Sequence, residues 1–391
     1  MLIKKRFFIG FSFTVFMISS VIAEDFKYAD YKPTININYQ PDISTDEGGF
    51  WYKVNQLEKN VKSSPYLIRD EELNQYISKL VCKLAGEYCS SIRVYIIDNP
   101  NFNASMYPNG MMQIWTGLLL RIENEDQLAA ILGHEIAHYL RTHQIEQWRN
   151  AHNNAAISLI LDAGIAAVTG VYGIASLAML GNNSSFSREH EKEADIIGVN
   201  LMSEAGYDPM EASHLWYKII EERKNDESID NGFIFFASHP PSEKRTEYLR
   251  QYAETITFEK HVTVNKKLQN IISKQYYNLM RNHIALGEYG QSQTLLERHN
   301  KLRYPKKYIN FFYGELYRKR AKEGDIEKAI EYYTLASKLP EPPVDVFKQL
   351  GYIYLKKNKK NKSLKNFLMY LKLNPNANDK AMINYYIKSL G

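Results

Sequence analysis

The segment HEIAH, residues 134–138, constrains the fold of this chain more than any other stretch. It lies in a run whose apolar residues recur at helical spacing, at Leu128, Ile131, Leu132, Ile136 and Leu140. Positions four apart lie on the same face of a helix, so His134 and His138 can reach one ion while Glu135 points to a water beside it. This is the H-E-x-x-H pattern of a zinc site with its own general base. A helix with two surface histidines is the alternative.

A second acidic motif lies downstream in SREHEKEAD, residues 187–195, which is predicted to begin a helix. Glu191 and Asp195 are four apart and share a face. One interpretation is a solvated helix start, where acids are favoured by the helix dipole. The other is that Glu191 completes a His/His/Glu zinc site, while Asp195 braces a ligand histidine. Glu189 and Glu193 lie off this face and are expected to be solvated.

These motifs occur in a specific order. HEIAH, SREHEKEAD and SHPPSEKR, residues 238–245, together resemble the HtpX-like and CAAX-prenyl-endopeptidase-like zinc metallopeptidases, which form metallopeptidase family 48. The pair Asn103–Ala104 also resembles a segment of that family ahead of the zinc helix. The resemblance covers about residues 65 to 252. It implies a gluzincin-type domain, mainly α with a small β-hairpin or sheet, and a zinc metalloendopeptidase activity.

The resemblance also implies a role for each matching residue. One Zn²⁺ per chain would be bound by His134, His138 and Glu191, with Glu135 as the general base, Asp195 behind a ligand histidine and Asn103 at the substrate. His239 and Arg245 would reach the site from the opposite side to stabilise an oxyanion. His239 could instead occupy the fourth zinc position in a closed state, or be a buried structural histidine beside a proline turn.

The N-terminus is typical of a secretory signal. Residues 4–6 are basic and residues 7–18 form an apolar run of about a dozen residues, too short for an ordinary membrane span. We expect cleavage after Ala23 and export to the periplasm, with an uncleaved anchor as the alternative. The two cysteines, Cys82 and Cys89, would then form a disulfide rather than two buried thiols.

Several elements of the first domain can be predicted from local patterns. They are an extended arm over 24–64, a helix capped by Asp70 and ending near Gly86, a strand over 92–97, a hairpin joining 102–107 to 111–115, a zinc helix over 125–148 capped by Asn124, and a helix over 208–224. The hairpin would border the zinc helix, and an extended substrate could add to its free edge. An ordinary structural hairpin is the alternative.

Residues 155–180 form the most apolar run after the signal. Asp162 and three glycines argue against a continuous membrane helix. We predict two short helices that cover the site and touch a bilayer surface, with a membrane span as the alternative. The net charge of +5 is too small for this length to indicate a nucleic-acid partner.

The last third of the chain has a different pattern. The spacing of small and aromatic residues is typical of tetratricopeptide repeats, at Gly314, Tyr317, Ala329, Tyr333 and Ala336 and again at Leu350, Gly351, Tyr354, Ser363, Phe367 and Pro375. We predict a peptidase domain over 65–262 and a repeat domain over 263–391 that binds peptides or partner proteins. A generic helical bundle is the alternative. The lysine-rich, acid-free segment 346–378 is a solvated face or a contact for an anionic membrane or acidic partner.

This combination of segments resembles Gram-negative envelope proteases. It implies a periplasmic zinc endopeptidase that degrades misfolded or stalled outer-membrane proteins, with the repeats docking on the barrel assembly machinery. The alternative is a chaperone or adaptor for outer-membrane protein assembly, in which the repeats carry the function and the zinc site is largely closed.

Overall fold

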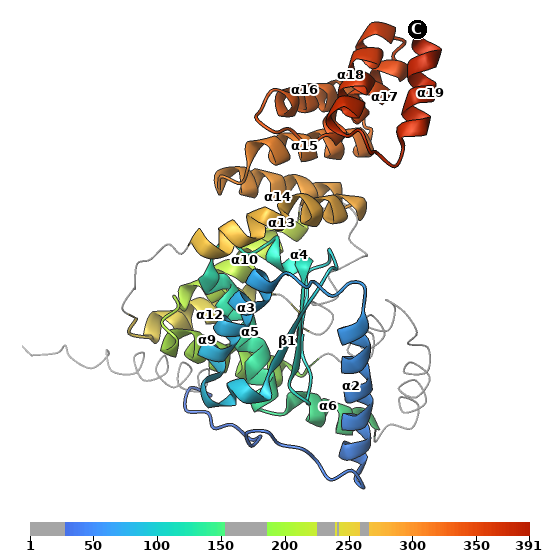
Figure 1. The fold of residues 1–391 in the computed structure, drawn as a ribbon. Coiled ribbons are helices and arrows are strands. Elements are labelled where there is room, and N and C mark those ends of the chain that lie inside the picture. The colour runs from blue at the N-terminus through green and yellow to red at the C-terminus, as the bar shows by residue number, and fades with distance from the viewer. Residues whose placement is uncertain (1–27, 153–185, 225–238, 241, 259–265) are drawn as a thin grey trace, which may run out of the picture.

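The structure is a computed structural model that describes residues 28–152, 186–224, 239–240, 242–258 and 266–391. A mixed domain carries the only sheet in these residues, and the C-terminal helices stack away from it in a curved array (Figure 1). The fold is therefore the expected one, a mainly helical domain with a small sheet followed by a helical region. The predicted signal at 1–23 and the apolar run at 155–180 lie outside the described residues.

The sheet has three strands in the order β1-β3-β2. β1 (Arg93–Ile97) is parallel to β3 (Met111–Trp115), and β2 (Ala104–Met106) is antiparallel to β3. The predicted strand and hairpin are thus confirmed. The hairpin turn needs Gly110, whose φ is 84° and whose missing Cβ would lie 1.9 Å from the Ser91 carbonyl oxygen.

The central helix is α5 (Glu125–Leu140), and its residues from Gln127 to Leu140 are all buried. Asn124 caps it by accepting a hydrogen bond from the Gln127 N–H, as predicted. α9 (Arg188–Glu204) crosses it closely. A Cβ on Gly133 would lie 2.8 Å from the Gly198 carbonyl oxygen, so both helices need glycine at the crossing. This close approach places the acidic start of α9 beside the histidines of α5.

The prediction that this helix continues to Trp148 is wrong. α5 ends at Leu140, Thr142 has a φ of 57°, and a separate helix, α6 (His143–His152), follows. The Leu140 carbonyl accepts the N–H of Thr34 at 2.8 Å. This hydrogen bond from a distant segment replaces the one that the next turn of the helix would have supplied. The break changes the direction of His143 relative to His138.

The predicted extended arm over 24–64 is also partly wrong. Its second half is a helix, α2 (Asp46–Ser63), which Thr45 caps by accepting from the Gly48 N–H. α2 covers the sheet with Val54, Leu57 and Val61, which pack on Ile97, Met111 and Trp115. Residues 51–61 present an apolar face to the sheet, and this burial favours a helix over the extended arm that was predicted.

The remaining elements of this domain are α3 (Glu71–Ala85), the 3₁₀ helix η1 (Gly86–Ser91), α4 (Thr116–Leu119), α10 (Met210–Lys224) and α12 (Glu243–Thr255). Of these elements, α3 and α10 pack on α5. Asp70 caps α3 as predicted, by accepting from the Leu73 N–H at 2.9 Å. Cys82 on α3 and Cys89 on η1 form a disulfide in the structure.

The C-terminal array consists of successive helices that pack on one another: α13 (Lys266–Ala285), α14 (Tyr289–Lys301), α15 (Lys306–Arg320), α16 (Asp325–Ser337), α17 (Asp345–Lys356), α18 (Lys360–Leu373) and α19 (Lys380–Leu390). Two of its helix pairs share one contact. Gly314 of α15 lies against the Tyr333 ring, and Gly351 of α17 lies against the Phe367 ring. This recurrence agrees with helical repeats, while their assignment as tetratricopeptide repeats stays a prediction.

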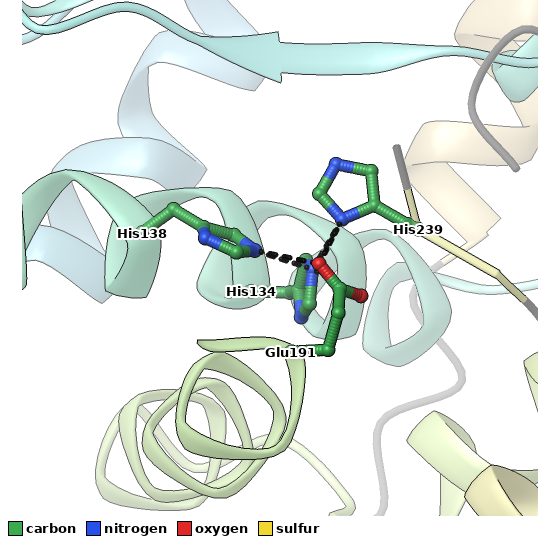
Figure 2. A group of neighbouring side chains, drawn as sticks. All are labelled: His134, His138, Glu191 and His239. Atoms are coloured by element: carbon green, nitrogen blue, oxygen red, sulfur yellow. Dashed lines mark hydrogen bonds and ion pairs between the residues drawn. The ribbon is translucent and has the colours of Figure 1, made fainter. Parts of the chain in front are cut away.

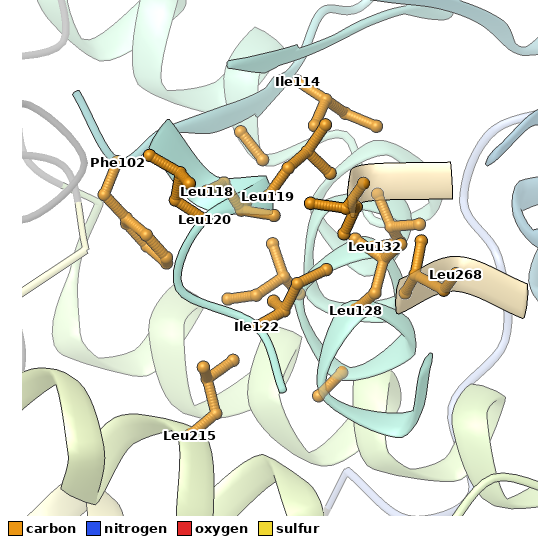
Figure 3. Packing of buried hydrophobic residues seen from close by; sticks show 14 of the residues in the cluster. Phe102, Ile114, Leu118, Leu119, Leu120, Ile122, Leu128, Leu132, Leu215 and Leu268 are labelled. Atoms are coloured by element: carbon orange, nitrogen blue, oxygen red, sulfur yellow. The ribbon is translucent and has the colours of Figure 1, made fainter. Parts of the chain in front are cut away.

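The array joins the first domain through a buried charged cluster. Arg121 and Glu222 have fully buried side chains, and Arg121 Nε lies 2.8 Å from Glu222 Oε1. Arg121 Nη2 also donates to Gln291 Oε1 on α14, at 3.1 Å. Apolar packing continues across the same junction, since Leu268 of α13 lies in the cluster that contains Leu128 (Figure 3). The first helices of the array are therefore part of the same core.

Arg121→Met is expected to lower the free energy of unfolding by about 3–5 kcal/mol, because it leaves the Glu222 carboxylate buried without its closest cation. Urea denaturation followed by circular dichroism measures this change. Lys218→Met is the matched control, since its half-buried pair with Glu123 should contribute only about 0–1 kcal/mol. Equal unfolding free energies for the two variants would contradict the expected cost of leaving the Glu222 carboxylate buried and unpaired.

Candidate metal centre

Four potential metal ligands converge from three segments of the chain. His134 and His138 project from α5, Glu191 from the start of α9, and His239 from the segment before α12, and Figure 2 shows them pointing towards one another. One nitrogen or oxygen from each lies within 4.8 Å of the others, and all four residues are buried. The structure thus brings the three predicted ligands together with His239.

The spacing of these atoms fits a zinc ion. Bonds of about 2.0 Å in a tetrahedral site separate the ligand atoms by about 3.3 Å. His134 Nε2 lies 3.0 Å from His138 Nε2, which lies 3.3 Å from Glu191 Oε1. His239 Nδ1 lies 3.1 Å from His134 Nε2. Imidazole nitrogens with one carboxylate are a donor set that zinc accepts.

His134 is oriented by a carboxylate behind it. Its Nδ1 lies 2.9 Å from Asp195 Oδ1, so its Nε2 faces the centre of the cluster. Arg245 in turn lies 2.6 Å from Asp195 Oδ1 and 2.9 Å from Glu191 Oε2, and its guanidinium stacks on the Trp216 ring at 3.9 Å. Arg245 thus reaches the site as predicted and contacts both carboxylates, while its role at an oxyanion stays a prediction.

The charges favour a cation at this point. Burial raises the pKa of a carboxyl group, but His239 and Arg245 outweigh it and hold the pKa of Glu191 well below its usual value. Arg245 and His134 lower the pKa of Asp195 in the same way against its burial. Burial lowers the pKa of His134 and His138, which favours the neutral imidazole that binds metal.

Glu135 lies between the cluster and the edge of the sheet. Its Oε2 accepts the N–H of Met106 at 3.0 Å, and its Oε1 lies 3.5 Å from His239 Nε2. Burial raises the pKa of Glu135 to about 7, with a further increase from Glu191 and an opposing effect of His239. A carboxyl group with this pKa can both accept and release a proton near neutral pH.

The edge of the sheet beside the cluster is strand β2, as the predicted hairpin required. The backbone N–H and C=O of Met106 are directed away from β3. The N–H donates to Glu135 Oε2, and the C=O accepts from Gln144 Nε2 at 3.1 Å. Asn103 is buried just before β2, and its carbonyl accepts the Trp115 N–H. Its predicted role in substrate binding stays a prediction.

Comparison with known proteins agrees with this geometry. The model of peptidase family M48 matches residues 67–253, which carry all four converging side chains. This part of the chain belongs to peptidase family M48. Zinc, the expected cofactor, agrees with this family and with the donor set.

Curated relatives are similar to part of this chain over part of their own length. The β-barrel assembly-enhancing protease of Escherichia coli O157:H7 is 29% identical over 189 residues, which are 44% of this chain and 37% of the relative. The mitochondrial metalloendopeptidase OMA1 of Schizosaccharomyces pombe is 31% identical over 178 residues, 45% of this chain and 51% of the relative. The chain thus spans about half or less of the relatives' length. Among the described helices, none has an apolar stretch long enough to cross a bilayer.

Two polar residues of the M48 domain have surroundings that the sequence did not predict. Glu193 was expected to be solvated, but it is buried and paired with Arg141 at 2.6 Å. His143 is buried between Glu193 and His138. A continuous helix would have placed His143 away from the face of His138, so only the break after Leu140 brings it there.

Proposed function

We propose that the protein is a zinc metalloendopeptidase. The observation that carries this proposal is the convergence of His134, His138 and Glu191 beside Glu135, at the edge of β2, in a domain of family M48. When bound, zinc supplies the Lewis acidity that makes water a nucleophile near neutral pH and polarises a carbonyl. The protein side chains would supply the proton transfers and hold the substrate.

Glu135 is positioned for both proton transfers. As a general base it would take a proton from the attacking water, and it would then deliver that proton to the leaving amine. The β2 edge would hold the substrate backbone as an added strand, once the Met106 N–H and C=O exchange Glu135 and Gln144 for substrate groups. His239 and Arg245 would face the developing oxyanion from the α12 side.

The substrates would be misfolded or stalled outer-membrane proteins in the periplasm. The predicted signal over 1–23 and the similarity to a protease named for β-barrel assembly support this assignment. The similarity to a mitochondrial metalloendopeptidase supports the chemistry and not the compartment. The helical array would dock on the barrel assembly machinery, the segment 155–180 would contact the membrane peripherally, and no nucleic acid would take part.

Metal removal tests the proposal directly. The purified chain should contain about one zinc ion and cleave casein, and 1,10-phenanthroline followed by desalting should abolish cleavage. Added Zn²⁺ should restore cleavage, whereas added Mg²⁺ should not, because this donor set is suited to zinc. Full cleavage by the metal-free chain would refute the proposed activity.

A second candidate function, a chaperone or adaptor with a closed site, is favoured by one observation. His239 Nδ1 lies 2.7 Å from Glu191 Oε1, within the ligand group, where it would occupy the position that water needs. Outer-membrane protein assembly can be compared between a strain with Glu135→Gln and a strain lacking the gene. Full assembly with the variant would favour the adaptor, and a defect equal to the deletion would favour the protease.

A further inference from the structure

The two histidines of HEIAH are supported in different ways. Asp195 contacts His134 directly, at its Nδ1. His138 Nδ1 instead lies 2.9 Å from Nδ1 of another histidine, His143. His143 Nε2 lies 3.2 Å from Glu193 Oε2, so a chain of contacts joins His138 to a carboxylate through a second imidazole.

This chain has one arrangement of protons that is consistent with metal binding. His138 Nε2 faces the ligand cluster, so it must carry a lone pair and the proton must lie on Nδ1. The Nδ1–H then donates to His143 Nδ1, which must be the acceptor. The proton of His143 therefore lies on Nε2, where it donates to Glu193 Oε2. Each partner thus selects the tautomer of the next.

The surroundings hold the chain in place. Arg141 Nε donates to Glu193 Oε1 at 2.6 Å, which leaves Oε2 directed at His143. The His190 ring stacks on the His143 ring, with centroids 4.3 Å apart and planes at 13°. His143 and Glu193 are both buried, so water does not substitute easily for either contact. Helices α6 and α9 are thereby joined behind the ligand.

We propose that His143 and Glu193 are positioning residues, which fix the tautomer and ring orientation of His138 so that its Nε2 binds the metal. The inference rests on the proposed zinc function and adds to it. Contacts of this kind raise the basicity of a ligand and prevent ring rotation, and their loss weakens metal affinity by about 10–100-fold. Neither residue is one of the four converging ligands.

The test compares two substitutions at one position. His143→Leu fills a similar volume but removes the acceptor for the His138 Nδ1–H, whereas His143→Gln keeps an acceptor oxygen. Zinc dissociation constants are measured by competition with a chromophoric chelator. We expect His143→Leu to raise the zinc Kd about 10–100-fold and His143→Gln to raise it by only about 3-fold. Glu193→Ala, which removes the other end of the chain, should raise the zinc Kd in the same direction as His143→Leu.

The matched control is His190→Ala, which removes the ring stacked on His143 without breaking the chain of hydrogen bonds. An equal rise in the zinc Kd for His190→Ala and His143→Leu would mean that packing alone matters, and it would overturn the proposal. An unchanged zinc Kd in His143→Leu would overturn it as well. Circular dichroism checks that each variant is folded. If His143→Leu does not fold, the zinc Kd of Glu193→Ala tests the proposal instead. A wild-type chain that binds no zinc would refute the proposed function itself, which distinguishes the two failures.

Discussion

Glu135→Gln is expected to lower kcat/KM for a peptide substrate by about 10²–10⁴-fold, while the zinc content stays at the wild-type level. The amide keeps the shape of the side chain and can still accept the Met106 N–H, so the local structure should be retained. It cannot take a proton from water, so the chemical step is lost. Glu135 is not one of the four converging ligands, which is why metal should remain bound.

The measurement is the initial rate of cleavage of a fluorogenic peptide, with zinc determined in the same samples. Glu189→Gln is the control, because Glu189 is an exposed acid near the start of α9 whose side chain bonds Tyr28. It should leave both quantities unchanged. Wild-type rates with Glu135→Gln would show that another group is the base.

Glu191→Ala should remove zinc from the purified chain and abolish cleavage. The substitution deletes the only carboxylate among the four ligands, and it leaves the Arg245 guanidinium 3.4 Å from His134 Nδ1 without one of its two anions. The three remaining imidazoles carry no negative charge, and Arg245, now paired with Asp195 alone, makes it less favourable to place a divalent ion among them. The loss should exceed the effect of about 10–100-fold that accompanies changes to residues behind the ligands.

Zinc content after gel filtration and the zinc Kd by chelator competition provide the measurement. Glu189→Ala, on the same helix, should bind zinc like the wild type. Full occupancy by Glu191→Ala at micromolar zinc would mean that Glu191 is not a ligand. In that case the carboxylate would serve only to hold Arg245 and His239.

Features set by neighbouring residues could be predicted from the sequence. The caps of α3 and α5 at Asp70 and Asn124 are short side chains that bond an N–H three residues ahead, so the local pattern is sufficient. The hairpin before α5 depends on a turn at Asn109–Gly110 in the same way. Two histidines four apart share a helix face wherever the helix lies, so their convergence also follows from spacing.

Features set by distant segments could not be predicted. Helix α5 ends at Leu140, whose carbonyl accepts hydrogen bonds from the N–H and the hydroxyl of Thr34, more than a hundred residues earlier in the chain. The burial of Glu193 depends on Arg141 and His143, whose positions follow from that ending. No periodicity within the segment 187–195 encodes these contacts, and a charged helix start is solvated in most proteins. The error at Glu193 is thus a consequence of the error at the end of α5.

The junction at Arg121 has a consequence for anything that binds the C-terminal helices. Because α13 packs in the core of the M48 domain and Gln291 of α14 accepts a hydrogen bond from the buried Arg121, the start of the array is held directly against that domain. A client held on α15 to α19 would therefore meet the zinc helix at a fixed separation and angle. The length of chain between the point of capture and the point of cleavage would be set by the geometry of the molecule, and clients too short to span it would escape cleavage.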